Sequence, residues 1–204
     1  MVRREYNNVN RNLRKDNFKE GVSMKIAKPV IIEDYNDDWP IIFNELREIL
    51  EKKLGDLALT IEHVGSTSVL GLAAKPIIDL DVVIDSMSIF PQVIIKLSEL
   101  GYFHEGNLGV KNREAFARRD ENVPYSKDMI KKPEHHLYVC VRESDPLIKH
   151  ITFRDILRKH PHLVREYSML KKELAEKYKN NRSGYTEGKT EFVQSVMEKY
   201  MNTL

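Results

Sequence analysis

The sequence predicts an α/β protein: strands and helices alternate over about residues 25–143, and helices alone occupy about residues 144–204. Three observations support this fold class. In the first portion, short runs rich in β-branched residues end at glycine or polar clusters, and longer segments repeat apolar residues at helical spacing. In the second portion, successive helical segments open at prolines. The length of 204 residues suits a single domain, which we assign to residues 24–204.

The composition is that of a soluble globular protein, with 41% hydrophobic and 31% charged residues. A net charge of +2 is too small to indicate a nucleic-acid partner, and none is expected. No apolar run in the sequence reaches the length of a membrane span, so no membrane partner is expected either. Cys140 is the sole cysteine, which excludes an intramolecular disulfide and is typical of a cytoplasmic protein.

The first 23 residues differ from the rest of the chain. They are polar, rich in Asn and Arg, and lack apolar periodicity, so we predict a flexible basic extension over residues 1–23. An arm that contacts nucleic acid is the alternative, but acidic residues within the segment dilute its charge. Met24 offers an alternative start, because a strand-like run over 25–32 begins directly after it.

The first portion is predicted to begin with a helix over 34–54. Asp37 or Asp38 caps this helix, Pro40 fits its first turn, and Gly55 follows as a stop. The same reading of periodicity and glycine positions predicts the other elements. They are strands over 57–64, 76–84, 113–120 and 135–141, a helical turn over 66–73, and a helix over 90–101.

The second portion is predicted to be helical throughout. Pro146 and Pro161 each fall in a first turn, where the missing N–H costs nothing. The lysine-rich run 171–179 is expected to be the solvated face of its helix. The predicted helices cover 144–160, 161–178 and 186–201, with a turn cluster over 180–185.

Acidic residues occur inside the most apolar strand. Side chains alternate between the faces of a strand, so Asp79, Asp81 and Asp85 share one face, with neighbours about 6.7 Å apart. Two carboxylates at that spacing suit a cation such as Mg²⁺, which binds through one or two carboxylates and substrate phosphates. The alternative is a sheet edge where the acids are solvated or paired with Arg or Lys. Asp85 ends the strand, and we expect it to cap the next element.

A Gly-Ser pair precedes the acidic strand. Gly65 lets the backbone approach a phosphate closely, and the hydroxyl of Ser66 or Thr67 adds a donor. Simple capping of a helical turn is the alternative. With Asp79 and Asp81 on the next strand, a phosphate cradle and a metal pair would face one cleft, which suits a nucleoside triphosphate with Mg²⁺.

The order of these motifs resembles a known family. A hydrophobic residue, Gly-Ser, a gap of about a dozen residues and Asp-x-Asp, as in "VGSTSVLGLAAKPIIDLDVVI", is similar to the nucleotidyltransferase superfamily pattern. More narrowly, the chain resembles the GrpB family (UPF0157) over roughly residues 31–201. The motifs that carry this resemblance are "DYNDDW", "LGYFHEG", "HHLYV", "FRDILRKHP" and "YTEGKTEFV".

The resemblance implies a nucleotidyltransferase-like mixed β-sheet flanked by helices. It also implies that Gly65 and Ser66 lie near phosphate and that Asp79 and Asp81 hold a metal, Mg²⁺ or Mn²⁺. It supplies no substrate, because the family itself is poorly characterised.

Active nucleotidyltransferases usually carry a third acid on a later strand, and the equivalent strand here, "HHLYVCV", has none on its relevant face. His136, Tyr138 and Cys140 share that face by alternation. His136 is our candidate to ligate the metal or to act as general base. A hydrogen-bonded structural histidine is the alternative.

Three basic residues are further candidates for phosphate binding: Lys75, Arg118 and Lys189. For each, a surface or structural salt bridge is the competing interpretation. The sequence thus leads to two functional hypotheses. One is a metal-dependent enzyme that moves a nucleotidyl group from a nucleoside triphosphate to an unknown acceptor. The other is a catalytically silent module that binds a nucleotide or a CoA-related ligand.

Overall fold

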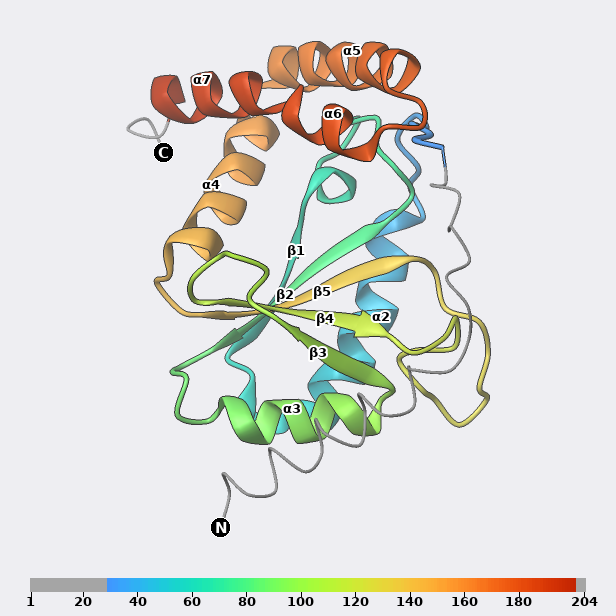
Figure 1. Ribbon diagram of the computed structural model, residues 1–204, viewed down its shortest axis with the longest axis vertical. Helices are drawn as coiled ribbons and strands as arrows, with labels where there is room; N and C mark the ends of the chain where they lie inside the picture. The colour runs from blue at the N-terminus through green and yellow to red at the C-terminus, as the bar shows by residue number, and fades with distance from the viewer. Residues whose placement is uncertain (1–28, 201–204) are drawn as a thin grey trace.

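A five-stranded mixed sheet forms the centre of the molecule (Figure 1). A computed structural model of the chain describes residues 29–200. The strands lie in the order β1-β2-β5-β4-β3; β2 and β5 are parallel, and the other neighbours are antiparallel. Their bounds are β1 Thr60–Val64, β2 Ile78–Ile84, β3 Tyr102–Gly106, β4 Arg113–Arg118 and β5 His135–Val141.

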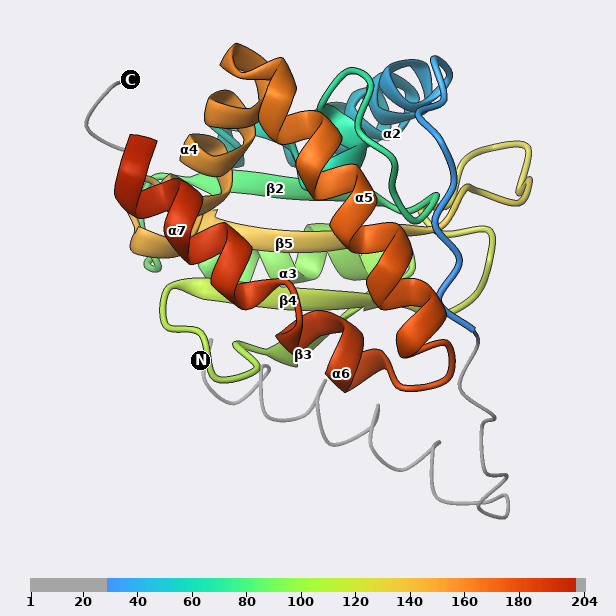
Figure 2. The same cartoon turned by 90° about the horizontal axis from the view of Figure 1, so that it is seen from above.

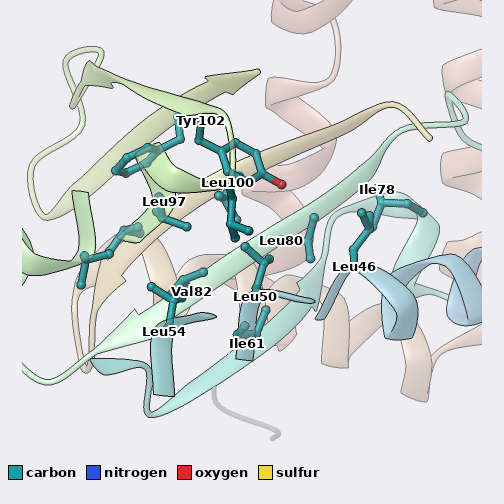
Figure 3. Close-up of a cluster of buried hydrophobic side chains, with 14 of the residues drawn as sticks. Leu46, Leu50, Leu54, Ile61, Ile78, Leu80, Val82, Leu97, Leu100 and Tyr102 are labelled. Atoms are coloured by element: carbon teal, nitrogen blue, oxygen red, sulfur yellow. The ribbon is translucent and has the colours of Figure 1, made fainter. Parts of the chain in front are cut away.

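Helices α2 (Trp39–Leu54) and α3 (Phe90–Glu99) cover one face of the sheet. Both helices repeat apolar residues at helical spacing, so each presents one stripe to the strands. The main hydrophobic core lies between these layers (Figure 3). Within it, the leucines of α2 pack with the inward residues of β2, namely Leu46, Leu50, Leu54, Ile78, Leu80 and Val82.

The C-terminal helices lie over the opposite face (Figure 2). Apolar contacts of Leu147 with Val83 and Cys140 join the first of them to the sheet. Across residues 29–200, no helix has both the length and the apolar character needed to cross a bilayer. The bounds of the C-terminal helices are α4 Asp145–Lys159, α5 Pro161–Lys177, α6 Arg182–Glu187 and α7 Thr190–Tyr200.

The structure confirms the predicted fold class, a mixed sheet flanked by helices with a helical C-terminal portion. Strand β3 was not predicted, because it is short, only partly apolar and begins directly after the glycine that ends α3. The predicted last helix is interrupted at Gly188, so its residues belong to two helices, α6 and α7. Helix α6 begins inside the predicted turn cluster.

Two predictions concern the N-terminal region. The flexible extension over residues 1–23 lies outside the described residues. Of the strand-like run 25–32, the described part, 29–32, is not a strand; only Glu33 pairs, through an isolated bridge to Ala74.

Candidate functional site

Two aspartate–histidine pairs lie on the face of the sheet that the C-terminal helices cover. Asp79 and Asp81 alternate with the buried Leu80 along β2, so both carboxylates point to this face. Parallel pairing sets His136 of β5 beside Asp79, and its Nδ1 lies 2.8 Å from Asp79 Oδ1. His150 approaches from α4, with Nδ1 2.7 Å from Asp81 Oδ2. Assigning the proton to Nδ1 lets each ring donate to its carboxylate and leaves Nε2 for other partners.

The position of His150 depends on how α4 is anchored to the sheet. One turn further along α4, Arg154 donates from Nη1 to Glu62 Oε2 at 2.7 Å and to the His63 carbonyl at 3.1 Å, both on β1. Its Nε also donates to Asp155 at 2.7 Å. A planar guanidinium with several fixed partners holds one orientation well. These bonds therefore fix the helix that carries His150 against the edge of the site.

The donor set fits a divalent cation. Asp81 is fully buried, at 0% exposed, and its Oδ1 has no hydrogen-bond partner among the described residues. A buried carboxylate oxygen without compensation is costly, and Mg²⁺ or Mn²⁺ takes such oxygens as ligands. Over residues 29–200, no cluster of three or more His, Cys, Asp or Glu side chains is arranged for a metal. The two aspartates alone would therefore bind the ion, with substrate phosphates completing its coordination.

The absence of a side chain at Gly65 leaves room for the Asp79 carboxylate. The residue ends β1 with φ +69° and ψ −171°, a conformation that is essentially restricted to glycine. A Cβ at this position would lie 2.8 Å from Asp79 Cγ and closer still to Oδ2. The glycine that the sequence analysis expects near phosphate therefore also makes room for the Asp79 carboxylate.

We expect Gly65→Ala to lower the free energy of unfolding by about 1–3 kcal/mol from backbone strain, and also to displace Asp79. Chemical denaturation measures the first effect, and metal binding by calorimetry measures the second.

Gly55→Ala is the matched control, because Gly55 also has positive φ, +55°, but nothing lies within 4 Å of the added Cβ. It should lose comparable stability and keep metal binding. Equal metal affinity in the two variants would contradict a steric link between Gly65 and Asp79.

Ser66 is held by a buried lysine. Lys171 of α5 donates from Nζ to Ser66 Oγ at 2.9 Å and lies 4.6 Å from the centroid of the Tyr167 ring. Only 2% of Lys171 is exposed, and no ion-pair partner for it lies among residues 29–200. Burial, and then the nearby charge of Lys189, lower the pKa of Lys171 from 10.5 to about 7. An anion beside Ser66 would restore the charged form and supply the missing partner.

Two more lysines share the ring of Tyr185. Lys75 Nζ lies 4.4 Å and Lys189 Nζ 4.7 Å from its centroid. Burial, then the charges of Arg182 and Lys189, lower the pKa of Lys75 to about 8. Burial also lowers the pKa of Lys189, while the negative charge of Asp79 opposes this shift. Positive charge is therefore concentrated beside Asp79 without an ion-pair partner in the described part of the chain.

A pocket of about 800 Å³ connects several of these groups. It begins at Gly65, Ser66 and Asp79, passes Lys189 and His150, and continues between α4 and α7. Its volume falls in the range of small-molecule sites, about 300–1,000 Å³. The Gly-Ser pair, one acid of the Asp-x-Asp pair and a lysine predicted to bind phosphate therefore open into one space.

Thr67, a predicted phosphate-binding residue, is buried away from this pocket. Its hydroxyl donates to the Ile77 carbonyl at 3.3 Å and lies 3.0 Å from His63 Nε2. The His63 ring stacks on Phe43, with centroids 4.5 Å apart, and burial lowers its pKa to about 4. A neutral His63 donates to the threonine oxygen, so Thr67 links β1 to the loop before β2, and we remove it from the phosphate site.

Arg118 also lies away from the pocket. Alternation along β4 places it on the α2–α3 face of the sheet, with Phe116, which pairs with Leu137. Its Nη1 donates to the carbonyls of Lys132 and Pro133, at 3.4 and 3.2 Å. Arg118 therefore cannot reach a phosphate beside Ser66. The sequence shows alternation but not which face of β4 meets the pocket.

Sequence reasoning missed two residues of the site. His150 had no distinguishing signal, and Lys171 lies in the run predicted to be a solvated helix face, which is wrong for this residue. The periodicity holds one clue, because Lys171 follows Tyr167 by one turn on the buried stripe of α5. Asp85, expected to be outside the site, pairs with Arg142 at the surface, 3.1 Å away.

Comparison with known proteins gives consistent relatives. The family model described as GrpB protein matches residues 29–199. The glutamate-rich protein GrpB of Alkalihalophilus pseudofirmus is 33% identical over 169 residues, 82% of this chain and 94% of that protein. The UPF0157 protein YqkA of Bacillus subtilis is 32% identical over 164 residues, 80% of this chain, and this match spans 45% of the length of YqkA.

Solved structures agree with the sequence relatives. The crystal structure of conserved protein GrpB from Enterococcus faecalis matches with a TM-score of 0.72 and 28% identity, over 85% of this chain and 98% of that one. The Cid1 structure in complex with the UTP analogue UMPNPP matches with a TM-score of 0.48 and 17% identity, over 77% of this chain and 48% of that one. The latter similarity is too low to bear on function.

Proposed function

Since the chain belongs to the GrpB family, whose pattern of Gly-Ser and Asp-x-Asp it carries, we propose that it is a metal-dependent nucleotidyltransferase. It would move a nucleotidyl group from a nucleoside triphosphate to an acceptor. One observation carries the proposal: the pocket places Asp79, whose neighbour Asp81 has one unpartnered oxygen, near Lys171 and Lys189, which have no counter-charge within residues 29–200. A triphosphate and a divalent cation supply both missing partners at once.

The phosphates would bind at the Gly65–Ser66 end of the pocket. Lys171 and Lys189 are close enough to Ser66 and Asp79 to neutralise a polyphosphate there. Lys75 adds positive charge beside the Tyr185 ring. Desolvated ammonium groups favour a highly charged anion over a neutral ligand, because binding restores their protonated form.

Asp79 and Asp81 would hold Mg²⁺ or Mn²⁺. When bound, the ion supplies charge stabilisation for the phosphoryl oxygens and orients them. His136 keeps the Asp79 carboxylate in one rotamer through its Nδ1–H, which completes the site beside β5. His150 does the same for Asp81 and lines the pocket with its ring.

The transfer itself would be an in-line displacement. The acceptor hydroxyl oxygen attacks the α-phosphorus, and the bond from that phosphorus to the bridging oxygen breaks, so that pyrophosphate leaves toward Ser66 and Lys171. The acceptor's proton passes to Nε2 of His150, whose Nδ1–H is held by Asp81. Positioning and charge stabilisation account for most of the catalysis in such a reaction.

A second candidate function is a silent module that binds a nucleotide or a CoA-related ligand. One observation favours it: Tyr138 is the residue of β5 opposite Asp81, where a third carboxylate would stand. Such a module would use the same lysines and the same pocket without turnover.

Calorimetry with ATP, with and without Mn²⁺, tests the proposal. We expect one ATP per chain, with an affinity that falls at least about tenfold when the metal is omitted, because the aspartates then repel the phosphates. Pyrophosphate release in the presence of a metabolite pool separates the two candidates. Tight binding without any release favours the silent module, and metal-independent affinity contradicts the transferase.

A further inference from the structure

We propose that the part of the pocket between α4 and α7 is the acceptor subsite. We also propose that the acceptor is a small molecule whose reacting hydroxyl is carried on an apolar ring or aliphatic body. This inference rests on the proposed function, which leaves the acceptor open. It follows from the direction of the pocket and from the chemistry of its walls.

The direction comes from the order of groups along β2. The unpartnered lysines border Asp79, whereas His150 borders Asp81, about 6.7 Å further along the strand. In an in-line displacement, the attacking and leaving oxygens lie on opposite sides of the phosphorus. If pyrophosphate leaves toward Ser66, the acceptor approaches from the side of His150. That side of the pocket is the space between α4 and α7.

The walls of this space are largely apolar. α4 contributes Ile148 and Phe153, and α7 contributes Val193 and Met197. All four are only partly buried, so apolar surface faces the pocket. α4 also adds the cations Lys149 and Arg154. Arg154 is already bonded to Glu62 and Asp155, and the acids Asp145 and Glu198 line the same space. A polynucleotide acceptor would need a track of cations for its phosphates; this surface suits a hydrocarbon body.

A packed aromatic group forms part of this wall, because Phe153 and Tyr167 both line the pocket. Phe153 meets the Tyr167 ring edge to face at 5.5 Å, and Tyr167 stacks on Phe192 at 4.8 Å with an interplanar angle of 2°. Aromatic rings packed in this way have few rotamers to lose when a ligand binds. The wall is therefore preorganised, which favours a ligand with a rigid ring.

Ile148→Lys tests the subsite with the neutral fluorescent probe N-phenyl-1-naphthylamine. Ile148 is already 46% exposed, so the variant should fold normally. A charge on the wall should weaken probe binding at least about tenfold, because the apolar contact is lost and the ammonium is desolvated. Ile95→Lys is the matched control: Ile95 is 56% exposed and lies on α3, on the other face of the sheet. It should bind the probe like wild type.

Competition with ATP identifies what the wall binds. The acceptor assignment predicts that ATP with Mn²⁺ and the probe bind together. Displacement of the probe by ATP would assign the wall to the nucleobase and overturn the inference. Wild-type probe affinity in Ile148→Lys would overturn it as well. Failure of the proposed function gives a different result. In that case the wild-type protein does not bind ATP in calorimetry, regardless of its affinity for the probe.

Discussion

Replacing Asp81 by Asn is expected to abolish metal-dependent nucleotide binding without unfolding the protein. The side chain is fully buried, and its Oδ1 has no partner in the described part of the chain, so this oxygen contributes little to the fold in the absence of a cation. Asn has the same shape, and its amide oxygen can still accept the Nδ1–H of His150. The lost negative charge removes a direct metal ligand, and the affinity for ATP with Mn²⁺ should fall about 100-fold or more.

Stability should move in the opposite direction. A buried carboxylate with one unpaired oxygen is costly in the metal-free protein, and a neutral amide that keeps the bond to His150 lowers that cost. We therefore expect the midpoint of thermal unfolding of metal-free Asp81→Asn to equal or exceed that of wild type. Added Mn²⁺ and ATP should raise the midpoint of wild type only.

Asp85→Asn is the control for this experiment. Asp85 directly follows the same strand, but it is exposed and paired with Arg142. Its variant should keep wild-type affinity for ATP with Mn²⁺. If Asp81→Asn binds as tightly as Asp85→Asn, the two aspartates do not hold a metal.

Replacing Lys171 by Met is expected to weaken triphosphate binding about 10- to 100-fold, the range for a lost charged hydrogen bond. Met fills the same buried space beside Tyr167, so the fold should survive. Calorimetry with ATP and Mn²⁺ measures the loss. Lys172→Met on the same helix is the control, because Lys172 points to solvent and pairs with Asp34, 2.6 Å away. Equal affinities in the two variants would remove Lys171 from the phosphate site.

The pH dependence of unfolding gives Lys171 a second, independent readout. Its pKa is about 7 in the folded protein and 10.5 when unfolded. Below pH 7 both states carry the proton, and the folded state bears the cost of a buried charge. Between pH 7 and 10.5 the unfolded state binds one more proton, so stability rises with pH. Wild type should show this rise relative to Lys171→Met in chemical denaturation, and parallel curves would contradict it.

Much of the fold followed from local patterns in the sequence. Proline in first turns and apolar residues at helical spacing located α2, α4 and α5, and β-branched runs located the two central strands. Strand β3 was not predicted from the sequence, because its five residues are of mixed polarity and form a strand only by pairing with β4. Helix α6 was not predicted, because most of it lies in the predicted turn cluster 180–185, where Ser183 and Gly184 are poor helix formers. Its Tyr185 is buried against Leu174 of α5, a contact that the local sequence does not show.

Some features of the candidate site could likewise be predicted from the sequence, and others required the tertiary structure. Alternation along β2 requires that Asp79 and Asp81 share a face, and the Gly-Ser pair just upstream lies close to them, because β1 and β2 are antiparallel neighbours. The placement of His136 beside Asp79 needed the register of two strands that are far apart in sequence. The sequence could not show that Arg118 and Thr67 lie away from the pocket. Tertiary packing decided which face of β4 carries Arg118 and buried Thr67 beside His63.

The sequence by itself determined most of the helices and strands, the shared face of Asp79 and Asp81, and the need for glycine before Ser66. These features depend on local backbone geometry, which a few neighbouring residues specify. Only the tertiary structure decided that His150 and Lys171 belong to the site, that Lys171 is buried without a counter-charge, and that the pocket continues between α4 and α7. These features arise where helices from the end of the chain pack over strands from its beginning. Burial and pairing across that distance depend on the packing of the whole domain and leave no local pattern in the sequence.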